Sequence, residues 1–324
     1  MEWVFGSGAR RKADGRWAKE VRAKPEQPAA SLCLWQAGVG EQEAGGFRIY
    51  TFYASSAPHG TFTGLANMST THVPLFHRRS GAGQPIVILH GLFGSSDNLG
   101  SIAKELATDH EVVLVDQRDH GRSPQTDRIT YPLMAEDVFE LLAKEGLRDV
   151  VLVGHSMGGK TAMRFAQLYP GLLKQLVVID IGPREYTTRN HDHIMAALKD
   201  IDLSQKRTRQ EVEEHLARFV PEPGVVQFLM KSLYWGTAEQ LAWRFNVPVI
   251  ARDLNDILAP IGPGTVRTPT LFIRGGQSDY ITREDLPQIK EQFPGCRVET
   301  IDFAGHWVHA QAPEEVVELI RSVS

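Results

Sequence analysis

The feature that most constrains this chain lies at residues 150–163, where a strand pattern changes to a helix pattern at a single serine. The apolar run Val-Val-Leu-Val ends at Gly154, and a helix-forming stretch begins directly after Ser156. Residues 154–158, Gly-His-Ser-Met-Gly, fit the G-x-S-x-G pattern of a nucleophile elbow. Glycines at both ends allow neighbouring backbone to approach, and the strained turn raises the serine hydroxyl above the sheet. Because glycine-rich turns can match this pattern without function, its surroundings must support it.

Short, wholly apolar runs recur along the chain and predict strands that are buried on both faces of a sheet. They lie at residues 86–89, 112–115, 150–153, 175–179 and 269–273, and further strands are expected at 73–77 and 298–301. Apolar residues at helical spacing predict helices at 99–108, 134–144 and 283–292, and a last helix from residue 314. This alternation predicts a mostly parallel sheet that is flanked by helices and joined by right-handed crossovers.

The alternation stops over residues 183–246, which have the composition of charged helices with interleaved aromatic side chains. This segment is too long for a loop, and it lies between two expected strands. We therefore expect a helical cap that is inserted between sheet strands and lies over their carboxyl ends. Residues 68–182 and 247–324 form the expected α/β core.

The first 67 residues differ from the rest of the chain. They contain three of the six tryptophans and show no sustained helical or strand period. They lack the compact apolar core of a secretory signal, and their acidic residues argue against a mitochondrial presequence. We expect Met68 to be the natural start, and residues 1–67 to be an N-terminal extension that is not native or whose order the sequence does not fix.

Composition limits the compartment and the partners. The chain of 324 residues is 42% hydrophobic and 23% charged, with a net charge of -4, which gives no reason to expect nucleic acid or an anionic membrane as a partner. No apolar run approaches the roughly 18 residues that span a bilayer. Cys33 and Cys296 are too few and too far apart for a disulfide framework, which favours a reducing, cytoplasmic compartment.

His191 and His193 have no third ligand beside them, so no metal is expected. The sequence does not fix an oligomeric state.

Three residue types needed for nucleophilic catalysis follow separate strands. Ser156, Asp180 and His306 occur in the order serine, acid, histidine. Because the carboxyl ends of parallel strands meet at one edge, these side chains are expected to form a triad. Asp279 competes for the role of the acid. We favour Asp180, since an aspartate at the end of a buried strand needs a partner, and we expect Ser278 as a second hydrogen-bonding support.

An oxyanion hole requires two N–H groups near the serine. The N–H of Met157 follows the nucleophile, and the N–H of Leu92 follows the close-approach Gly91, with that of Phe93 as the alternative. Bulky side chains are expected to line the substrate pocket. These are Phe93, Trp307 and, from the cap, Trp235 and Trp243.

Several loops together resemble one known family, the YbfF-like esterases, which are grouped with mitochondrial abhydrolase-domain proteins and yeast ethanol acetyltransferases. The resemblance runs from about residue 73 to the C-terminus. It rests on the segments 90–95 (HGLFGS), 116–123 (DQRDHGRS), 154–160 (GHSMGGK), 179–183 (IDIGP) and 305–310 (GHWVHA). It implies an α/β-hydrolase fold with a small helical cap, which acts on short acyl esters or thioesters without a cofactor. In such relatives the acid lies on the strand after the nucleophile helix, which here gives Asp180. A serine occupies the position where the acid more commonly lies, which here is Ser278. Asp279 beside it departs from this pattern.

The expected function is therefore a serine carboxylesterase that hydrolyses short acyl esters through an acyl-enzyme on Ser156. A serine at the elbow argues against haloalkane dehalogenase and epoxide hydrolase chemistry, in which a carboxylate attacks. An acyl thioesterase or an alcohol acyltransferase with the same triad remains an alternative. A non-catalytic binding protein on the same scaffold is the alternative from another class.

Overall fold

The computed structural model describes residues 72–186 and 189–324, together with short strands within the first 71 residues. The chain divides into two units, Met1–Thr71 and His72–Ser324. In the first unit the described strands form two antiparallel sheets, although the sequence predicted no regular element there. They are β1 (Arg10–Arg11) with β2 (Trp17–Ala18), and β3 (Ala37–Ala44), β4 (Phe47–Ala54) and β5 (Thr61–Leu65) in that order. Met68, the expected start, lies outside the described residues.

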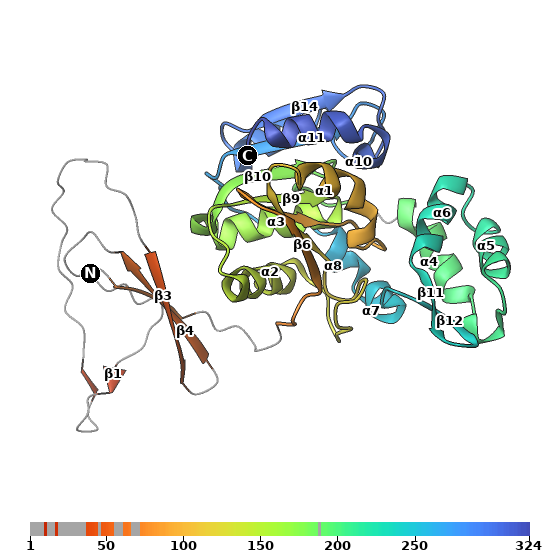
Figure 1. Ribbon diagram of the computed structural model, residues 1–324, viewed down its shortest axis with the longest axis horizontal. Coiled ribbons are helices and arrows are strands. Elements are labelled where there is room, and N and C mark those ends of the chain that lie inside the picture. The colour runs from red at the N-terminus through yellow and green to blue at the C-terminus, as the bar shows by residue number, and fades with distance from the viewer. Residues whose placement is uncertain are drawn as a thin grey trace. The chain divides into compact units, whose positions relative to one another are not determined.

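In the second unit the described strands form a seven-stranded sheet in the order β14-β13-β10-β9-β7-β8-β6 (Figure 1). All neighbouring pairs are parallel except β6 with β8. The strands are β6 (His77–Gly81), β7 (Pro85–Leu89), β8 (Glu111–Val115), β9 (Val150–His155), β10 (Leu173–Ile179), β13 (Thr270–Gly275) and β14 (Arg297–Ile301). The prediction of a mostly parallel sheet is thus confirmed.

The first strand of this sheet differs from its prediction. A strand was expected at residues 73–77, but β6 begins only at His77. Pro74 has no N–H to donate to a neighbouring strand. The N–H of Phe76 donates to the hydroxyl of Ser123 at 2.8 Å and not to a backbone carbonyl of β8. The carbonyl of Phe76 still accepts the N–H of Asp116 at 2.9 Å.

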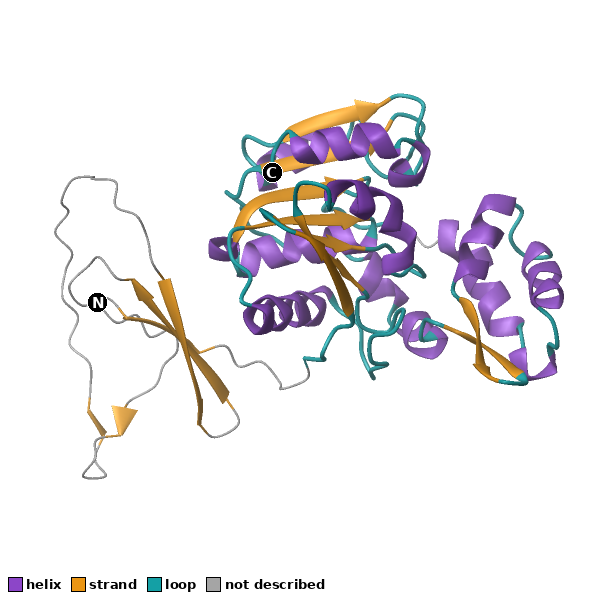
Figure 2. Ribbon diagram, viewed as in Figure 1, coloured by secondary structure: helices purple, strands orange, loops and turns teal. Residues whose placement is uncertain are grey.

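Helices cover both faces of the sheet, which explains why its central strands are apolar on both sides (Figure 2). Alternate residues of each strand, such as Ile86 and Ile88 of β7, pack with the helices of one face, and the residues between them face the other side. The first face carries η1 (Ser96–Leu99), α1 (Gly100–Leu106), α10 (Val308–Gln311) and α11 (Pro313–Arg321). The second carries α2 (Tyr131–Glu145), α3 (Met157–Leu168), η2 (Pro170–Leu172) and α9 (Leu286–Gln292).

We call the segment between β10 and β13 the cap segment (residues 189–258). Its elements up to residue 243 lie apart from the sheet, and its last two helices lie against the core (Figure 1). Most of the segment is helical. It also contains a two-stranded antiparallel hairpin that its charge and aromatic pattern did not predict. Its elements are α4 (Arg189–Asp200), η3 (Leu203–Gln205), α5 (Arg209–Ala217), α6 (Pro223–Lys231), β11 (Leu233–Thr237), β12 (Gln240–Trp243), α7 (Val247–Arg252) and α8 (Leu254–Leu258).

Lys160 of α3 connects the two ends of the cap segment to the core. Its Nζ donates to the carbonyl of Arg184 at 2.8 Å, just before the cap segment, and to those of Leu258 at 3.2 Å and Ala259 at 2.5 Å, at its end. Burial lowers the pKa of Lys160 to about 7. The helix that begins at the elbow therefore fixes both connections of the cap segment.

Within the described residues, no helix combines the length and the apolar character that crossing a membrane requires.

Candidate active site

Ser156 lies at the sharp turn between β9 and α3, with φ of 52° in the left-handed region. Its N–H donates to the carbonyl of Ile179 at 3.0 Å, which fixes the turn against β10. Two glycines permit this geometry. A Cβ on Gly154 would collide with the backbone of Gly158, and a Cβ on Gly158 would lie 2.5 Å from the carbonyl oxygen of Leu89. The strain predicted for the elbow is thus present, and packing on both sides maintains it.

Asp180 follows β10 directly and is fully buried, also with a positive φ of 50°. Its Oδ1 accepts the N–H of Gly275 at 2.9 Å. Its Oδ2 accepts the hydroxyl of Ser278 and lies 2.9 Å from Nδ1 of His306. A buried carboxylate is costly unless hydrogen bonds compensate it, and here three donors do so.

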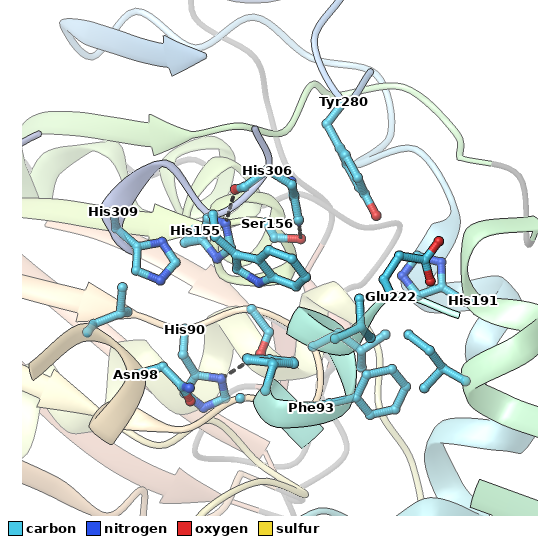
Figure 3. A pocket seen from close by; sticks show the side chains of 18 of the residues that line it. His90, Phe93, Asn98, His155, Ser156, His191, Glu222, Tyr280, His306 and His309 are labelled. Carbon is cyan, nitrogen blue, oxygen red and sulfur yellow. Dashed lines mark hydrogen bonds between the residues drawn. The ribbon is translucent and has the colours of Figure 1, made fainter. Parts of the chain in front are cut away.

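His306 follows β14 and connects the other two side chains. Its Nδ1 faces Asp180, and its Nε2 lies 3.1 Å from Oγ of Ser156. Because a carboxylate only accepts, Nδ1 carries the proton, and Nε2 is left to accept the serine proton. Figure 3 shows His306 beside Ser156 at the cavity.

Two residues that the sequence did not predict as parts of the site support His306. The ring of Tyr280 stacks on its imidazole with centroids 3.7 Å apart. The side chain of His155 bonds the backbone carbonyl of His306 through Nε2 at 2.9 Å. His155 adjoins the serine in the elbow motif, which is a usable signal. Tyr280 has no signal of its own in the sequence.

The structure separates the two competing carboxylates. Asp279 is exposed, and the interaction found at this residue is that of its backbone carbonyl with the guanidinium of Arg184 at 3.2 Å. Ser278 points inward and is buried against Asp180. Since neighbouring side chains in this turn point in different directions, the structure brings Asp180 and not Asp279 to His306.

The backbone near Ser156 offers donors for an oxyanion. Met157 is the first residue of α3, and the first N–H groups of a helix have no partner inside it. Of the two candidates after β7, Phe93 uses its N–H in a bond to Nε2 of His120 at 3.2 Å. No acceptor engages the N–H of Leu92 within the described residues, and Leu92 lines a small pocket together with Ser156 and Met157.

A cavity of about 440 Å³ opens at Ser156 and His306 (Figure 3). It is bounded by the loop after β7, by the elbow, by the loop after β14 and by the cap segment. Its apolar walls include Leu92, Phe93, Val220, Val225, Phe228 and Trp307. Phe93 and Trp307, two of the residues expected to line a substrate pocket, are among these walls.

The predictions for Trp235 and Trp243 were wrong. Both lie on the hairpin β11–β12, away from the cavity walls. Trp235 is 47% exposed, and Trp243 packs inside the cap segment, stacked on Phe245 at 5.2 Å. The cap segment contributes a different aromatic residue to the cavity wall, which is Phe228 of α6.

Several further histidines line the cavity and stay neutral at pH 7. Burial lowers the pKa of His191 and of His309 to about 4, and it holds the pKa of His155 well below its usual value. In the part of the chain that the structure describes, no three His, Cys, Asp or Glu side chains gather so as to hold a metal ion. Besides apolar groups and imidazoles, the cavity presents the side chains of Asn98 and Glu222 (Figure 3).

Comparisons with known proteins agree with this geometry. Residues 84–313 match the family described as alpha/beta hydrolase fold. Esterase YbfF of Escherichia coli (strain K12) is 41% identical over 237 residues, which cover 73% of this chain and 91% of that protein. The sn-1-specific diacylglycerol lipase ABHD11 of Danio rerio is 39% identical over 248 residues, or 74% and 78% of the two chains. The solved structure of a marine microorganism esterase matches with a TM-score of 0.76 and 42% identity, over 78% of this chain and 100% of that chain. The chain therefore belongs to the alpha/beta hydrolase family and, within it, to the ester-hydrolysing enzymes grouped with YbfF.

Proposed function

We propose that this protein is a serine carboxylesterase that hydrolyses short acyl esters through an acyl-enzyme on Ser156. The observation that carries the proposal is the continuous hydrogen-bonded series from Ser156 through His306 to the buried Asp180, at the edge of a cavity. Serine is a weak nucleophile by itself, and this arrangement supplies the base and the group that orients the base.

The reaction follows from this geometry. Nε2 of His306 accepts the hydroxyl proton while Oγ of Ser156 attacks the ester carbonyl carbon. The N–H groups of Leu92 and Met157 stabilise the oxyanion, and Asp180 stabilises the imidazolium. The imidazolium then protonates the leaving alcohol, and the carbon–oxygen bond breaks. Water repeats the sequence on the acyl-enzyme and releases the acid.

Labelling with a fluorophosphonate probe tests this proposal. The folded wild-type protein is expected to take up one label, because the probe reacts with an activated serine and the phosphonyl oxygen occupies the oxyanion hole. The Ser156→Ala variant is expected to take up none, as measured by mass spectrometry of the intact protein. Absence of labelling on folded wild type would contradict the proposal and favour a binding protein on a hydrolase scaffold.

The walls of the cavity favour short acyl groups. Its volume of about 440 Å³ has to hold the acyl chain, the ester and the leaving group, and Phe93, Phe228 and Trp307 restrict it. We therefore expect kcat/KM to be higher for p-nitrophenyl acetate and butyrate than for the palmitate ester, measured at equal concentrations below the micellar range. A highest value on palmitate would contradict a short-chain specificity.

The charges around the cavity favour a neutral ester over a thioester of coenzyme A. No lysine or arginine is among the residues found to line it. The basic run Lys206, Arg207 and Arg209 lies elsewhere, and Arg209 donates to the carbonyls of Leu233 at 2.7 Å and Met230 at 2.5 Å. Adding acetyl-coenzyme A or an alcohol acceptor to the same assay separates the esterase from the thioesterase and the acyltransferase.

A further inference from the structure

The loop that carries Leu92 is a tight turn with an unusual residue in it. The N–H of Gly94 donates to the carbonyl of Gly91 at 3.1 Å, which closes a β-turn with Leu92 second and Phe93 third. Phe93 has a positive φ of 62°. A positive φ at the third position is the feature of a type II turn, where glycine is the usual residue. A phenylalanine there is strained, so other contacts must maintain this backbone conformation.

The N–H and the carbonyl of Phe93 are each bonded to a segment that is distant in the sequence. Its N–H donates to Nε2 of His120, in the loop after β8. Nδ1 of His120 lies 2.9 Å from the carbonyl of Arg118, which keeps the proton on Nδ1 and leaves Nε2 an acceptor. The carbonyl of Phe93 accepts the hydroxyl of Ser232, in the cap segment, at 2.8 Å.

The loop after β8 and the cap segment, which both bind the backbone of Phe93, are also bonded to each other. The N–H of Asn246, in the cap segment, donates to the carbonyl of Asp119 at 2.9 Å, and its side-chain amide donates to the carboxylate of Asp119 at 2.9 Å. The ring of Phe93 packs edge-on against Phe245 with centroids 5.2 Å apart. The loop after β8 and the cap segment therefore hold Phe93 as one connected structure.

Ser232 is well placed to fix this position. It lies between α6 and β11, and its own carbonyl accepts the N–H of Arg244 at 2.8 Å. Its side chain is buried. It is not one of the residues found to line the cavity, so it does not reach a bound ester.

We propose that Ser232 is a positioning residue through which the cap segment orients the oxyanion hole. Its hydroxyl bonds the carbonyl of the Phe93–Gly94 peptide, and the N–H of that peptide bonds the carbonyl of Gly91. Because the carbonyl of Gly91 and the N–H of Leu92 belong to one planar peptide, this series of bonds sets the direction of the N–H of Leu92. The cap segment then contributes to catalysis besides enclosing the substrate. The inference rests on the proposed function, because it requires the N–H of Leu92 to act on an oxyanion.

The Ser232→Ala variant tests the inference, with Ser204→Ala as a control at an exposed serine of the same segment. Turnover of p-nitrophenyl butyrate is divided by the number of active sites, which the endpoint of fluorophosphonate labelling gives. Removing a whole oxyanion donor lowers kcat by roughly 10²–10³-fold, so the misorientation of one donor is expected to lower kcat about tenfold in Ser232→Ala. KM should stay near its wild-type value, and the affinity for a trifluoromethyl ketone analogue should fall in parallel with kcat. Ser232→Thr, which keeps the hydroxyl, should restore both.

A merely structural role of Ser232 predicts a different result. It would lower the melting temperature or the number of active sites and leave kcat per site unchanged. That result, or an equal loss in Ser204→Ala, would overturn the inference. Failure of the proposed function is a separate outcome, since the wild type would then show neither labelling nor turnover.

Discussion

Replacing Asp180 by asparagine is expected to lower kcat by about 10⁴-fold, as the loss of the acid does in a serine–histidine–aspartate triad. Asparagine has nearly the same shape, but its neutral amide neither holds His306 in the tautomer with the proton on Nδ1 nor stabilises the imidazolium. The carboxylate also accepts bonds from Gly275 and Ser278, which keep it in place. The measurement is kcat on p-nitrophenyl butyrate, with circular dichroism to establish that the variant is folded.

Asp279→Asn is the matched control for this experiment. Asp279 is exposed, one residue from the buried Ser278. We expect its variant to keep a turnover close to that of the wild type. A larger loss in Asp279→Asn than in Asp180→Asn would assign the acid to Asp279.

Replacing Gly158 by alanine is expected to destabilise the hydrolase unit and to inactivate it. The new Cβ would lie 2.5 Å from the carbonyl oxygen of Leu89 and 2.6 Å from that of His90, at the end of β7. Backbone at the end of a buried strand cannot move aside as a side chain does, so we expect about 3 kcal/mol of destabilisation, the upper part of the usual range for overpacking. For a unit of this size that corresponds to a fall in melting temperature of roughly 6–12 °C. Turnover should fall as well, because α3 and Ser156 shift together.

Gly171→Ala is the control, since a Cβ at Gly171 meets no atom within 4 Å. Its melting temperature and turnover are expected to remain near those of the wild type. If both variants melt at the same temperature, close packing at Gly158 is not what holds the elbow.

Local sequence patterns were sufficient to predict the mostly parallel sheet of the second unit. The apolar runs at 86–89 and 150–153 predict strands covered on both sides, because no polar residue interrupts them. Gly154 and Gly158 predict the elbow because both have to be small where backbone meets backbone. The order of Ser156, Asp180 and His306, each after a strand, predicts that these residues meet, since the carboxyl ends of parallel strands share one edge.

Contacts between distant segments decided the remaining features. The sequence favours Asp180 over Asp279 without excluding Asp279, and the direction of each side chain at its strand end separates them. It favours the N–H of Leu92 and keeps that of Phe93 as an alternative, whereas in the structure the N–H of Phe93 is bonded to His120. The aromatic residues of the cap segment follow the same principle, because aromatic side chains pack equally well into a cavity wall or into a neighbouring element. Local pattern thus fixes which elements form, whereas the direction of a side chain or an N–H depends on neighbours far away in the chain, which no local pattern encodes.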